Sequence, residues 1–491
     1  MPAIMIQGCG SDVGKTMLVA GLCRLLANRG FRVRPFKPQN MSNNAAVTPD
    51  GGEIGRSTAL QSLACRVPPS VHMNPILLKP QSDTGAQLIV RGRRAGNFPA
   101  RAYAETKREL LEVALDSYRT LAREADWIIV EGAGSPAETN LRAHDIANMG
   151  FAHAADLPVI LVGDINRGHV IASVVGAHAV LDAADRERIA GFIINKFRGD
   201  ARLFEDGIAT IVERTGWQRF GIVPWLPDAA HLPAEDAVQL EHRNAQHSNG
   251  AGKRVRISVV HLPHIANFDD FDPLKHEPNV DLRFVSPREP LPFESDLLIL
   301  PGSKATIADL ALLRACGWHH DVHAYLRRGG RVLGICAGYQ MLGRCVRDPL
   351  GIEGVVAQVE GFGCFDVDTE MTSSKQLREV RGIETTTGAP IRGYEMHVGR
   401  SSVRRDTTPM VRFEDGTSDG EVAAQGRVLG CHLHGIFHAP EFRGAFLSRL
   451  ALTPSSSDHA ERTNSALDSI AESLAQVLDL RLLEQVATRR R

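Results

Sequence analysis

The first thirty residues restrict the fold of this chain more than any other stretch. A short apolar run, "AIMIQG" (3–8), leads into a glycine-rich turn, "GCGSDVGKT" (8–16), and then into a stretch with leucines at helical spacing (16–30). A buried strand that turns tightly into a helix is the first unit of a parallel α/β layer. Further apolar runs follow at 126–132, 157–164 and 189–195. We therefore expect an α/β fold with a parallel sheet covered by helices on both sides.

A second series of the same kind begins after residue 253. Its apolar runs lie at 254–262, 295–303, 329–338 and 426–435. The stretch before it loses apolar periodicity and is typical of a linker, and leucines recur at helical spacing between 466 and 485. At 491 residues the chain is long enough for roughly two to four domains. We predict two α/β domains, a linker and a helical tail, at 1–227, 254–450, 228–253 and 451–491.

Composition excludes several classes of protein. The formal charge is −1 and no long basic run precedes the final "RRR", which argues against nucleic-acid binding. The eight cysteines are scattered without a CxxC pair, so neither a zinc ribbon nor a disulfide framework is expected. No signal peptide and no membrane-spanning run is found. These observations predict a cytoplasmic protein without a membrane partner.

The glycine-rich turn between strand and helix is a candidate phosphate loop. Successive backbone N–H groups would converge on an anion at the positive end of the helix dipole. Lys15 would bridge the outer phosphates of ATP, and Thr16 would bind Mg²⁺. Five residues separate Gly8 from Gly14, one more than in the strict pattern. The predicted ATP-binding residues of this loop are Gly8, Ser11, Asp12, Val13, Gly14, Lys15 and Thr16.

Two later strand ends carry polar residues that would complete the same site. Glu131 closes the run "WIIVE", where its carboxylate could hold a magnesium-bound water, or could face solvent. Asn195 and Lys196 close the run "IAGFIINK" and are candidates for contact with the adenine of ATP. The predicted metal-binding residues are therefore Thr16 and Glu131.

The stretch "LGICAGYQMLG" (333–343) places Cys336 on a turn between a strand and a helix. Flanking glycines at 334 and 338 match the layout of a nucleophile elbow with sulfur in place of oxygen. The helix N-terminus would favour the thiolate. The alternative is a packed core thiol. Candidate bases lie in "GCHLHGIFH", as His432, His434 and His438, and candidate oxyanion donors are the backbone N–H groups of Gly302 and Gly338.

Taken in order, these motifs identify a family. The second half resembles a class I glutamine amidotransferase domain, and the whole chain resembles the cobyric acid synthase family. The matching stretches are "GSDVGKT" (10–16), "FKPQNMSNNA" (36–45), "EIGRSTALQ" (53–61), "NPILLKPQSD" (74–83), "EGAGSPAETNL" (131–141), "GDINRGHV" (163–170), "NKFRGD" (195–200), "PGSKAT" (301–306), "GICAGYQMLG" (334–343), "GYEMHVGR" (393–400) and "HLHGIF" (432–437).

The resemblance implies an enzyme that amidates the b, d, e and g carboxylates of adenosylcobyrinic acid a,c-diamide, using ATP, Mg²⁺ and glutamine and no tightly bound cofactor. It implies Cys336 as the glutaminase nucleophile and His434 as its base. Amidotransferases usually complete the triad with H-x-E, but Gly435 and Ile436 follow His434 here. The group that orients His434 is therefore unassigned from the sequence.

A large polyanionic substrate needs donors along its binding cleft. Candidates near the nucleotide side are Gln39, Asn40, Asn43, Asn44, Arg56 and Lys79, although polar loops that serve only the fold would look the same. Tyr394, Glu395 and His397 of "GYEMHVGR" could contact glutamine, bridge the domains or merely pack. The expected partners are small molecules, and the sequence leaves a homo-oligomer open.

Two other functions fit the same modules. One is the corrinoid a,c-diamide synthase, which has the same order of domains. The other is a P-loop ATPase switch fused to an inactive amidotransferase-like module. Such switches carry an additional lysine early in the loop, whereas residues 9–13 read Cys-Gly-Ser-Asp-Val here. Cys336 and His434 also argue against an inactive module.

Overall fold

The computed structural model describes residues 1–82, 85–235, 254–354, 356–404, 407–453, 455 and 458–489. Its N-terminal half is built on a six-stranded sheet in the order β12-β11-β10-β1-β9-β2, and every neighbouring pair is parallel. The strands are β1 (Ala3–Gly8), β2 (Val33–Phe36), β9 (Trp127–Glu131), β10 (Val159–Asp164), β11 (Ile189–Phe197) and β12 (Gln218–Pro224). The predicted parallel sheet is confirmed.

Alternating side chains of β1 explain why both faces of this sheet are covered. Ala3 and Met5 belong to one apolar cluster, whereas Ile4 and Ile6 belong to a second cluster on the opposite face. The helices around the sheet are α1 (Lys15–Asn28), α2 (Arg56–Ala64), α3 (Ala100–Ala122), α4 (Met149–Ala154), α5 (Val170–Val180), α6 (Ala183–Arg188) and α7 (Glu205–Thr215). Short 3₁₀ turns are η1 (Thr139–His144), η2 (Ala201–Phe204) and η3 (Pro227–His231).

The C-terminal half has a second six-stranded sheet, in the order β15-β13-β16-β18-β26-β25, with only the edge strand β25 antiparallel. Its strands are β13 (Val255–Val260), β15 (Val280–Val285), β16 (Leu297–Leu300), β18 (Val332–Ile335), β25 (Glu421–Ala423) and β26 (Val428–Cys431). The helices and 3₁₀ turns of this half are η4 (Phe268–Phe271), α9 (Asp272–Lys275), α10 (Thr306–Ala315), α11 (Trp318–Arg327), α12 (Ala337–Leu342), η5 (Ala424–Gly426), η6 (Ile436–His438) and α13 (Pro440–Ser448).

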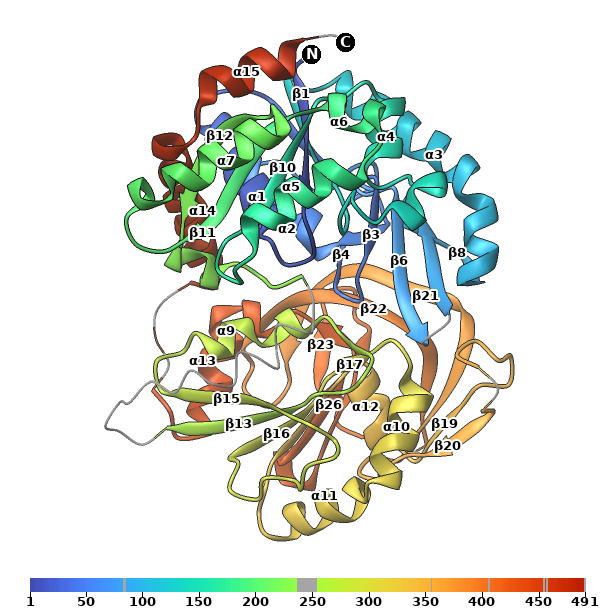
Figure 1. The fold of residues 1–491 in the computed structure, drawn as a ribbon. Helices are drawn as coiled ribbons and strands as arrows, with labels where there is room; N and C mark the ends of the chain where they lie inside the picture. Colours follow the sequence, from blue (N-terminus) through green and yellow to red (C-terminus); the bar gives the residue numbers. More distant parts are fainter. Residues whose placement is uncertain are drawn as a thin grey trace.

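One long antiparallel hairpin, which was not predicted, joins the halves. This hairpin of β21 (Val367–Glu384) and β22 (Pro390–Val403) rises from the C-terminal half toward β6 (Figure 1). Met396 of this hairpin packs in one apolar cluster with Val47, Leu77 and Ile89 of the N-terminal half. The remaining strands are β3 (Gln39–Met41), β4 (Ala45–Val47), β5 (Glu53–Gly55), β6 (Ile76–Ser82), β7 (Gly85–Val90), β8 (Arg93–Pro99), β14 (Ile265–Ala266), β17 (Gly302–Ser303), β19 (Cys345–Arg347), β20 (Gln358–Glu360), β23 (Val411–Phe413), β24 (Ser418–Asp419) and β27 (Leu433–His434).

The tail returns to the N-terminal half as two helices, α14 (His459–Val477) and α15 (Leu480–Thr488) (Figure 1). Its apolar residues share a cluster with α1, and a Cβ on Gly21 would lie 2.5 Å from Leu474 Cδ1, so a larger residue there would require the Leu474 side chain to shift. Of the predicted linker 228–253, residues 236–253 lie outside the described residues. The proposed boundaries between domains remain predictions.

All eight cysteines lie in the described ranges, and each is a free thiol. Within those ranges no helix combines the length and the apolar character that crossing a membrane would require. The same residues contain no group of three or more His, Cys, Asp or Glu side chains arranged to hold a metal ion.

Candidate active site

The glycine-rich turn lies between β1 and α1, the context that the sequence predicted for a phosphate loop. Asp12 and Gly14 have positive φ angles of 57° and 92°, which fold the loop back over the helix N-terminus. The Lys15 ammonium donates to the carbonyls of Gly10 and Gly134 at 3.0 and 3.2 Å. Burial lowers the pKa of Lys15, opposed by the nearby Glu131.

Two carboxylates and a second lysine meet beside this loop. The Thr16 hydroxyl lies 2.9 Å from Glu131 Oε1 and 2.9 Å from Glu235 Oε2. Lys37 Nζ lies 3.0 Å from Glu131 Oε1 and 2.5 Å from Glu235 Oε1. The Gln61 amide also donates to Glu131. Glu131 is fully buried, so the alternative of a solvent-facing acid is wrong.

The charges in this cluster stabilise one another. Burial alone would lower the pKa of Lys37, but the two carboxylates outweigh it and raise that pKa. Burial would raise the pKa of Glu235, yet Lys37 lowers it to about 2. Mg²⁺ prefers hydroxyl, carboxylate and phosphate oxygens, and usually takes one or two carboxylates from the protein. Thr16, Glu131 and Glu235 therefore fit a magnesium ion that also contacts a nucleotide.

Asn195 and Lys196 lie against the phosphate loop. The Asn195 amide donates to the carbonyl of Val13 at 2.8 Å, and a Cβ on Gly14 would lie 2.3 Å from that nitrogen. Lys196 donates to the Asp12 carbonyl and lies 2.8 Å from Asp164 Oδ2. Both side chains therefore brace the loop, and their contact with adenine stays a prediction.

Cys336 stands on the predicted turn, between β18 and α12. Its φ of 54° and ψ of −111° are unusual for a residue with a side chain and cost roughly 1–3 kcal/mol. A Cβ on Gly338 would lie 1.9 Å from the Leu300 carbonyl, so this glycine lets the helix approach the sheet. The thiol is only 6% exposed. Burial alone does not distinguish a nucleophile from an inert core thiol. The charged groups around Cys336 do distinguish them.

The imidazole of His434 is close enough to the Cys336 thiol to lower its pKa, and the thiol itself donates to the Met396 carbonyl at 3.8 Å. On its other side, His434 Nδ1 lies 2.7 Å from Asp270 Oδ2, and Asp270 Oδ1 accepts the Gly435 N–H at 2.8 Å. Asp270 is the orienting group that the sequence did not reveal. It comes from η4, which precedes His434 by 164 residues.

This row of groups favours a thiolate and an imidazolium. Burial would raise the pKa of the Cys336 thiol, but His434 outweighs it and lowers that pKa. Burial would lower the pKa of His434, but Asp270 and then Cys336 raise it to about 10. A packed and unreactive thiol would have no such partners. The geometry is that of an activated sulfur nucleophile.

The other candidate histidines have different surroundings. His432 Nδ1 lies 2.7 Å from Asp419 Oδ1, its Nε2 lies 3.1 Å from the Ser401 hydroxyl, and its ring stacks on His397 at 4.1 Å. His438 lines a cavity instead. Gly302 lies against the base, since its Cβ would be 2.9 Å from His434 Cε1. The oxyanion roles of Gly302 and Gly338 stay predictions.

Several predicted substrate residues are buried at the junction of the halves. Lys79 pairs with Glu53 at 2.5 Å, and Glu53 also pairs with Lys375 of the hairpin. The Asn40 amide donates to the Ser57 hydroxyl at 3.3 Å, and the Asn44 side-chain oxygen Oδ1 accepts the Phe268 N–H at 3.1 Å. Asn44 and Lys79 thus contact the other half, through Phe268 and Met396, whereas Asn40 bonds within its own half and Gln39 and Asn43 are half-buried.

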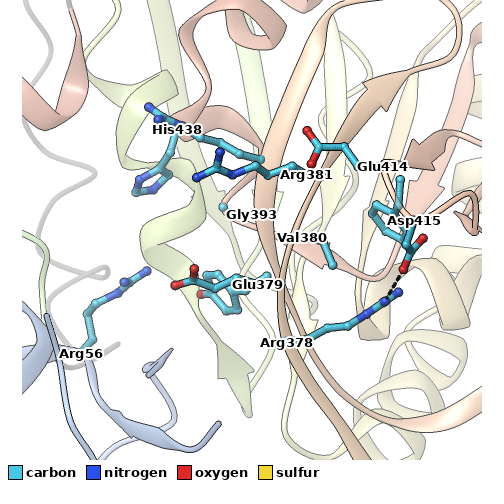
Figure 2. A pocket seen from close by; sticks show the side chains of 13 residues that line it. Arg56, Arg378, Glu379, Val380, Arg381, Gly393, Glu414, Asp415 and His438 are labelled. Atoms are coloured by element: carbon cyan, nitrogen blue, oxygen red, sulfur yellow. Dashed lines mark hydrogen bonds and ion pairs between the residues drawn. The ribbon is translucent and has the colours of Figure 1, made fainter. Parts of the chain in front are cut away.

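Arg56 differs from these residues because it lines a cavity. Its guanidinium pairs with Asp269, the neighbour of the orienting Asp270. The cavity (Figure 2) has a volume of about 620 Å³. Tyr394 and Gly435 also line it. Tyr394 stacks on the His434 ring at 5.4 Å. The stretch "GYEMHVGR" therefore bridges the halves beside the thiol.

Comparison with known proteins matches two family models to the chain. A model of the CobQ/CobB/MinD/ParA nucleotide binding domain matches residues 4–240, and a model of the CobB/CobQ-like glutamine amidotransferase domain matches residues 256–442. Cobyric acid synthase of Caulobacter sp. (strain K31) is 58% identical over 99% of this chain and 100% of its own length. The chain belongs to the cobyric acid synthase family.

Other relatives named cobyric acid synthase come from Sphingopyxis alaskensis (55% identity, 99% of each chain) and Sinorhizobium sp. (53% identity, 98% of this chain and 99% of that one). The protein is therefore an enzyme that contains a glutamine amidotransferase domain. Among solved structures, PurLQS of Thermotoga maritima has a TM-score of 0.30, 19% identity, and coverage of 44% of this chain and 97% of that chain. MinD of Aquifex aeolicus has a TM-score of 0.28, 17% identity, and coverage of 47% and 86%. At these scores neither likeness bears on function.

Proposed function

We propose that this enzyme amidates the b, d, e and g side-chain carboxylates of adenosylcobyrinic acid a,c-diamide to give adenosylcobyric acid, in cobalamin biosynthesis. The observation that carries the proposal is the row from Asp270 through His434 to Cys336 in the same chain as a phosphate loop. The 53–58% identity to proteins named cobyric acid synthase supports this product over the a,c-diamide. The nucleotide half would be residues 1–227, and the glutaminase half residues 254–450.

In the glutaminase half, the Cys336 thiolate would attack the side-chain carbonyl carbon of glutamine. The His434 imidazolium would give its proton to the leaving nitrogen, so that ammonia departs and a thioester remains. Water would then cleave the thioester, with His434 taking its proton, and glutamate would leave. Asp270 would hold the imidazole in the orientation that both steps require, as the acid of a hydrolase triad does. Gly302 and Gly338 would donate N–H groups to the oxyanion.

In the nucleotide half, a substrate carboxylate would attack the γ-phosphorus of ATP to form an acyl phosphate and release ADP. Ammonia would then displace phosphate from the acyl carbon and leave an amide. Lys15 and the loop N–H groups would stabilise the charge that moves during phosphoryl transfer. A magnesium ion held by Thr16, Glu131 and Glu235 would neutralise the phosphate oxygens.

The location of the two sites supports an internal route for the ammonia. The Cys336 thiol lies 3.8 Å from the Met396 carbonyl, and the Met396 sulfur lies 3.5 Å from Lys79 Nζ in the nucleotide half. Ammonia released into solvent at neutral pH would be largely protonated and no longer nucleophilic. We assign the enzyme to the cytoplasm, with small-molecule substrates only. A homo-oligomer and the absence of a nucleic-acid partner remain predictions.

The test uses a Cys336→Ser variant with ATP, Mg²⁺ and the corrinoid diamide. Glutamine hydrolysis should fall by about 10⁴-fold or more, because the nucleophile is gone. Ammonium salts should restore amidation, seen by mass spectrometry as successive replacements of a carboxyl oxygen by NH. If ammonium fails to restore amidation, the division of labour between the halves is wrong. If the unmodified enzyme leaves the corrinoid mass unchanged, the substrate is wrong.

A further inference from the structure

A large cavity between the halves has a lining that neither glutamine hydrolysis nor phosphate binding explains. Four arginines line it, Arg56 from α2 and Arg378, Arg381 and Arg392 from the hairpin. Figure 2 shows Arg56 entering from the N-terminal half and Arg381 from the opposite side, whereas Arg378 turns toward Asp415. Two segments far apart in sequence therefore present cations to one space.

Two of these arginines lack the partners that the other two have. Arg56 pairs with Asp269, and Arg378 pairs with Glu395 and Asp415. Arg381 and Arg392 lie directly opposite each other in the β21–β22 ladder, and neither forms an ion pair with any residue in the described part of the chain. Like charges in facing positions of a ladder are destabilising. An anionic ligand would remove that repulsion and use both guanidinium groups.

A second, apolar cavity of about 250 Å³ adjoins the first. The two share Arg56, Glu379 and Tyr394 in their walls. The second is lined mainly by Val47 and Leu63 with Ala46, Ala59, Val67 and Pro69, and Leu63 is 39% exposed. The combined space is thus charged on one side and apolar on the other. This lining suits a ligand with an apolar body and charged arms.

Helix α2 connects this space to the phosphate site. Arg56, Ala59 and Leu63 lie on the face that lines the cavities. Ser57 and Gln61 lie on the face that reaches the carboxylate cluster, since the Ser57 hydroxyl is 2.8 Å from Glu235 Oε1 and Gln61 donates to Glu131. A ligand arm that passes Arg56 would therefore arrive beside the loop that holds the phosphates.

We propose that these adjoining cavities bind the corrinoid, with the macrocycle over the apolar part and its carboxylate arms on Arg381 and Arg392. This inference rests on the proposed function for the identity of the ligand. The lining also holds Glu379 and Glu414. These acids can accept hydrogen bonds from carboxamide NH₂ groups, whereas arginines donate to carboxylates. A substrate that carries both acids and amides matches such a mixed lining.

The test measures binding of the corrinoid diamide by equilibrium dialysis, without ATP or glutamine, so that catalysis is not needed. Arg381→Ala and Arg392→Ala should each weaken binding about three- to fivefold, and the double variant about tenfold, since these are partly solvated charge pairs. The loss should shrink as salt is added. Arg381→Lys, which keeps the charge, should retain most of the affinity and shows that the hairpin still folds.

Arg400→Ala is the matched control. Arg400 is an exposed arginine on the same strand β22, outside both cavities, and its variant should bind like the parent. Parental binding by the double variant, or an equal loss in Arg400→Ala, overturns the proposed site. If that happens while the parent still amidates the corrinoid, only the site is wrong. If the parent neither binds nor amidates the corrinoid, the proposed function fails and this inference fails with it.

Discussion

The two reactive sites of this enzyme hold buried charge in different ways. At the phosphate loop, two carboxylates face one hydroxyl and are neutralised by the Lys37 ammonium, an arrangement that suits exchange with a magnesium nucleotide. At the thiol, charges of alternating sign form a fixed row from Asp270 through His434 to Cys336. In the proposed mechanism the first site receives charge from its ligands, whereas the second generates a nucleophile from its own residues.

Neighbouring acids link the two sites. Asp269 pairs with Arg56 of the nucleotide half, and Asp270 pairs with His434 of the glutaminase half. Both acids belong to the single turn η4. The turn η4 (Phe268–Phe271) thus contacts the nucleotide half through Asp269 and the base of the thiol through Asp270.

The largest effect should come from breaking the row of Asp270, His434 and Cys336 while the phosphate loop stays intact. Asp270→Asn should lower kcat for glutamine hydrolysis by about 10³-fold, because the imidazole loses the carboxylate that orients and charges it. Without that carboxylate the pKa of His434 falls and that of Cys336 rises. The pH midpoint of Cys336 alkylation by iodoacetamide should therefore move upward. Ammonium-dependent amidation should continue.

The control for this variant is Asp281→Asn on the edge strand β15, where Asp281 pairs with Arg283. It should hydrolyse glutamine at the parental rate. If Asp270→Asn also does so, with an unchanged alkylation midpoint, Asp270 only anchors the Gly435 backbone and the two sites differ less than proposed.

The next effect concerns the charges between the sites. Glu53 is buried between Lys79 and Lys375, so Glu53→Gln leaves two buried ammonium groups without a counter-charge. We expect a loss of about 3 kcal/mol in the free energy of unfolding, measured with urea. Burial lowers the pKa of Lys375 to about 8 against the opposing effect of Glu53. Loss of a proton from Lys375 would relieve part of the penalty.

The pH dependence of Glu53 has a definite sign. Burial would raise the pKa of Glu53, but Lys375 and Lys79 lower it to about 2. Its stabilising effect is therefore present above an unfolded pKa of about 4.3 and is lost as the pH falls toward 2. Glu205→Gln, which removes an exposed pair with Arg219, should cost less than about 1 kcal/mol. An unchanged urea midpoint for Glu53→Gln would show that the halves are held by apolar packing alone.

From the sequence we could predict only those parts of each site that consist of consecutive residues. The phosphate loop and the elbow are short patterns whose geometry follows from glycine spacing between a strand and a helix, and both were predicted together with the parallel sheets. Lys37 and Glu235 were missed because nothing local marks them, and Asp270 was missed because its local signal is weak. Glu235 joins Thr16 across 219 residues, from a stretch that lacks periodicity and was predicted as linker. The "DD" of Asp269 and Asp270 was the only visible signal of the orienting acid.

The long hairpin was missed for a different reason. In β21 most side chains are polar or half-exposed, because its role is to meet the other half and the cavity rather than to fill a core. Alternating apolar residues are the usual sign of a strand, and here they are sparse. Two pairs can be seen only in the folded structure, where segments far apart in sequence lie side by side. They are Arg381 with Arg392 and Glu53 with Lys375.

The smallest effect per residue concerns a row of histidines at the junction. Rings of His231, His276, His459 and His438 follow one another at centroid distances of 5.1, 5.6 and 5.1 Å. Burial, with the cationic neighbours, lowers the pKa of His276 to about 4 and that of His459 to about 3.

The stability that these neutral rings support is present above the unfolded pKa of about 6.5 and is lost as the pH falls toward 4. Between pH 7 and 5 the urea midpoint should drop by the equivalent of about 2 kcal/mol for each of the two rings, and a His276→Gln, His459→Gln double variant should lose less over the same interval. His144→Gln, at an exposed position, should keep the parental slope. An equal slope in the double variant would place the acid sensitivity in the two reactive sites rather than in the junction between them.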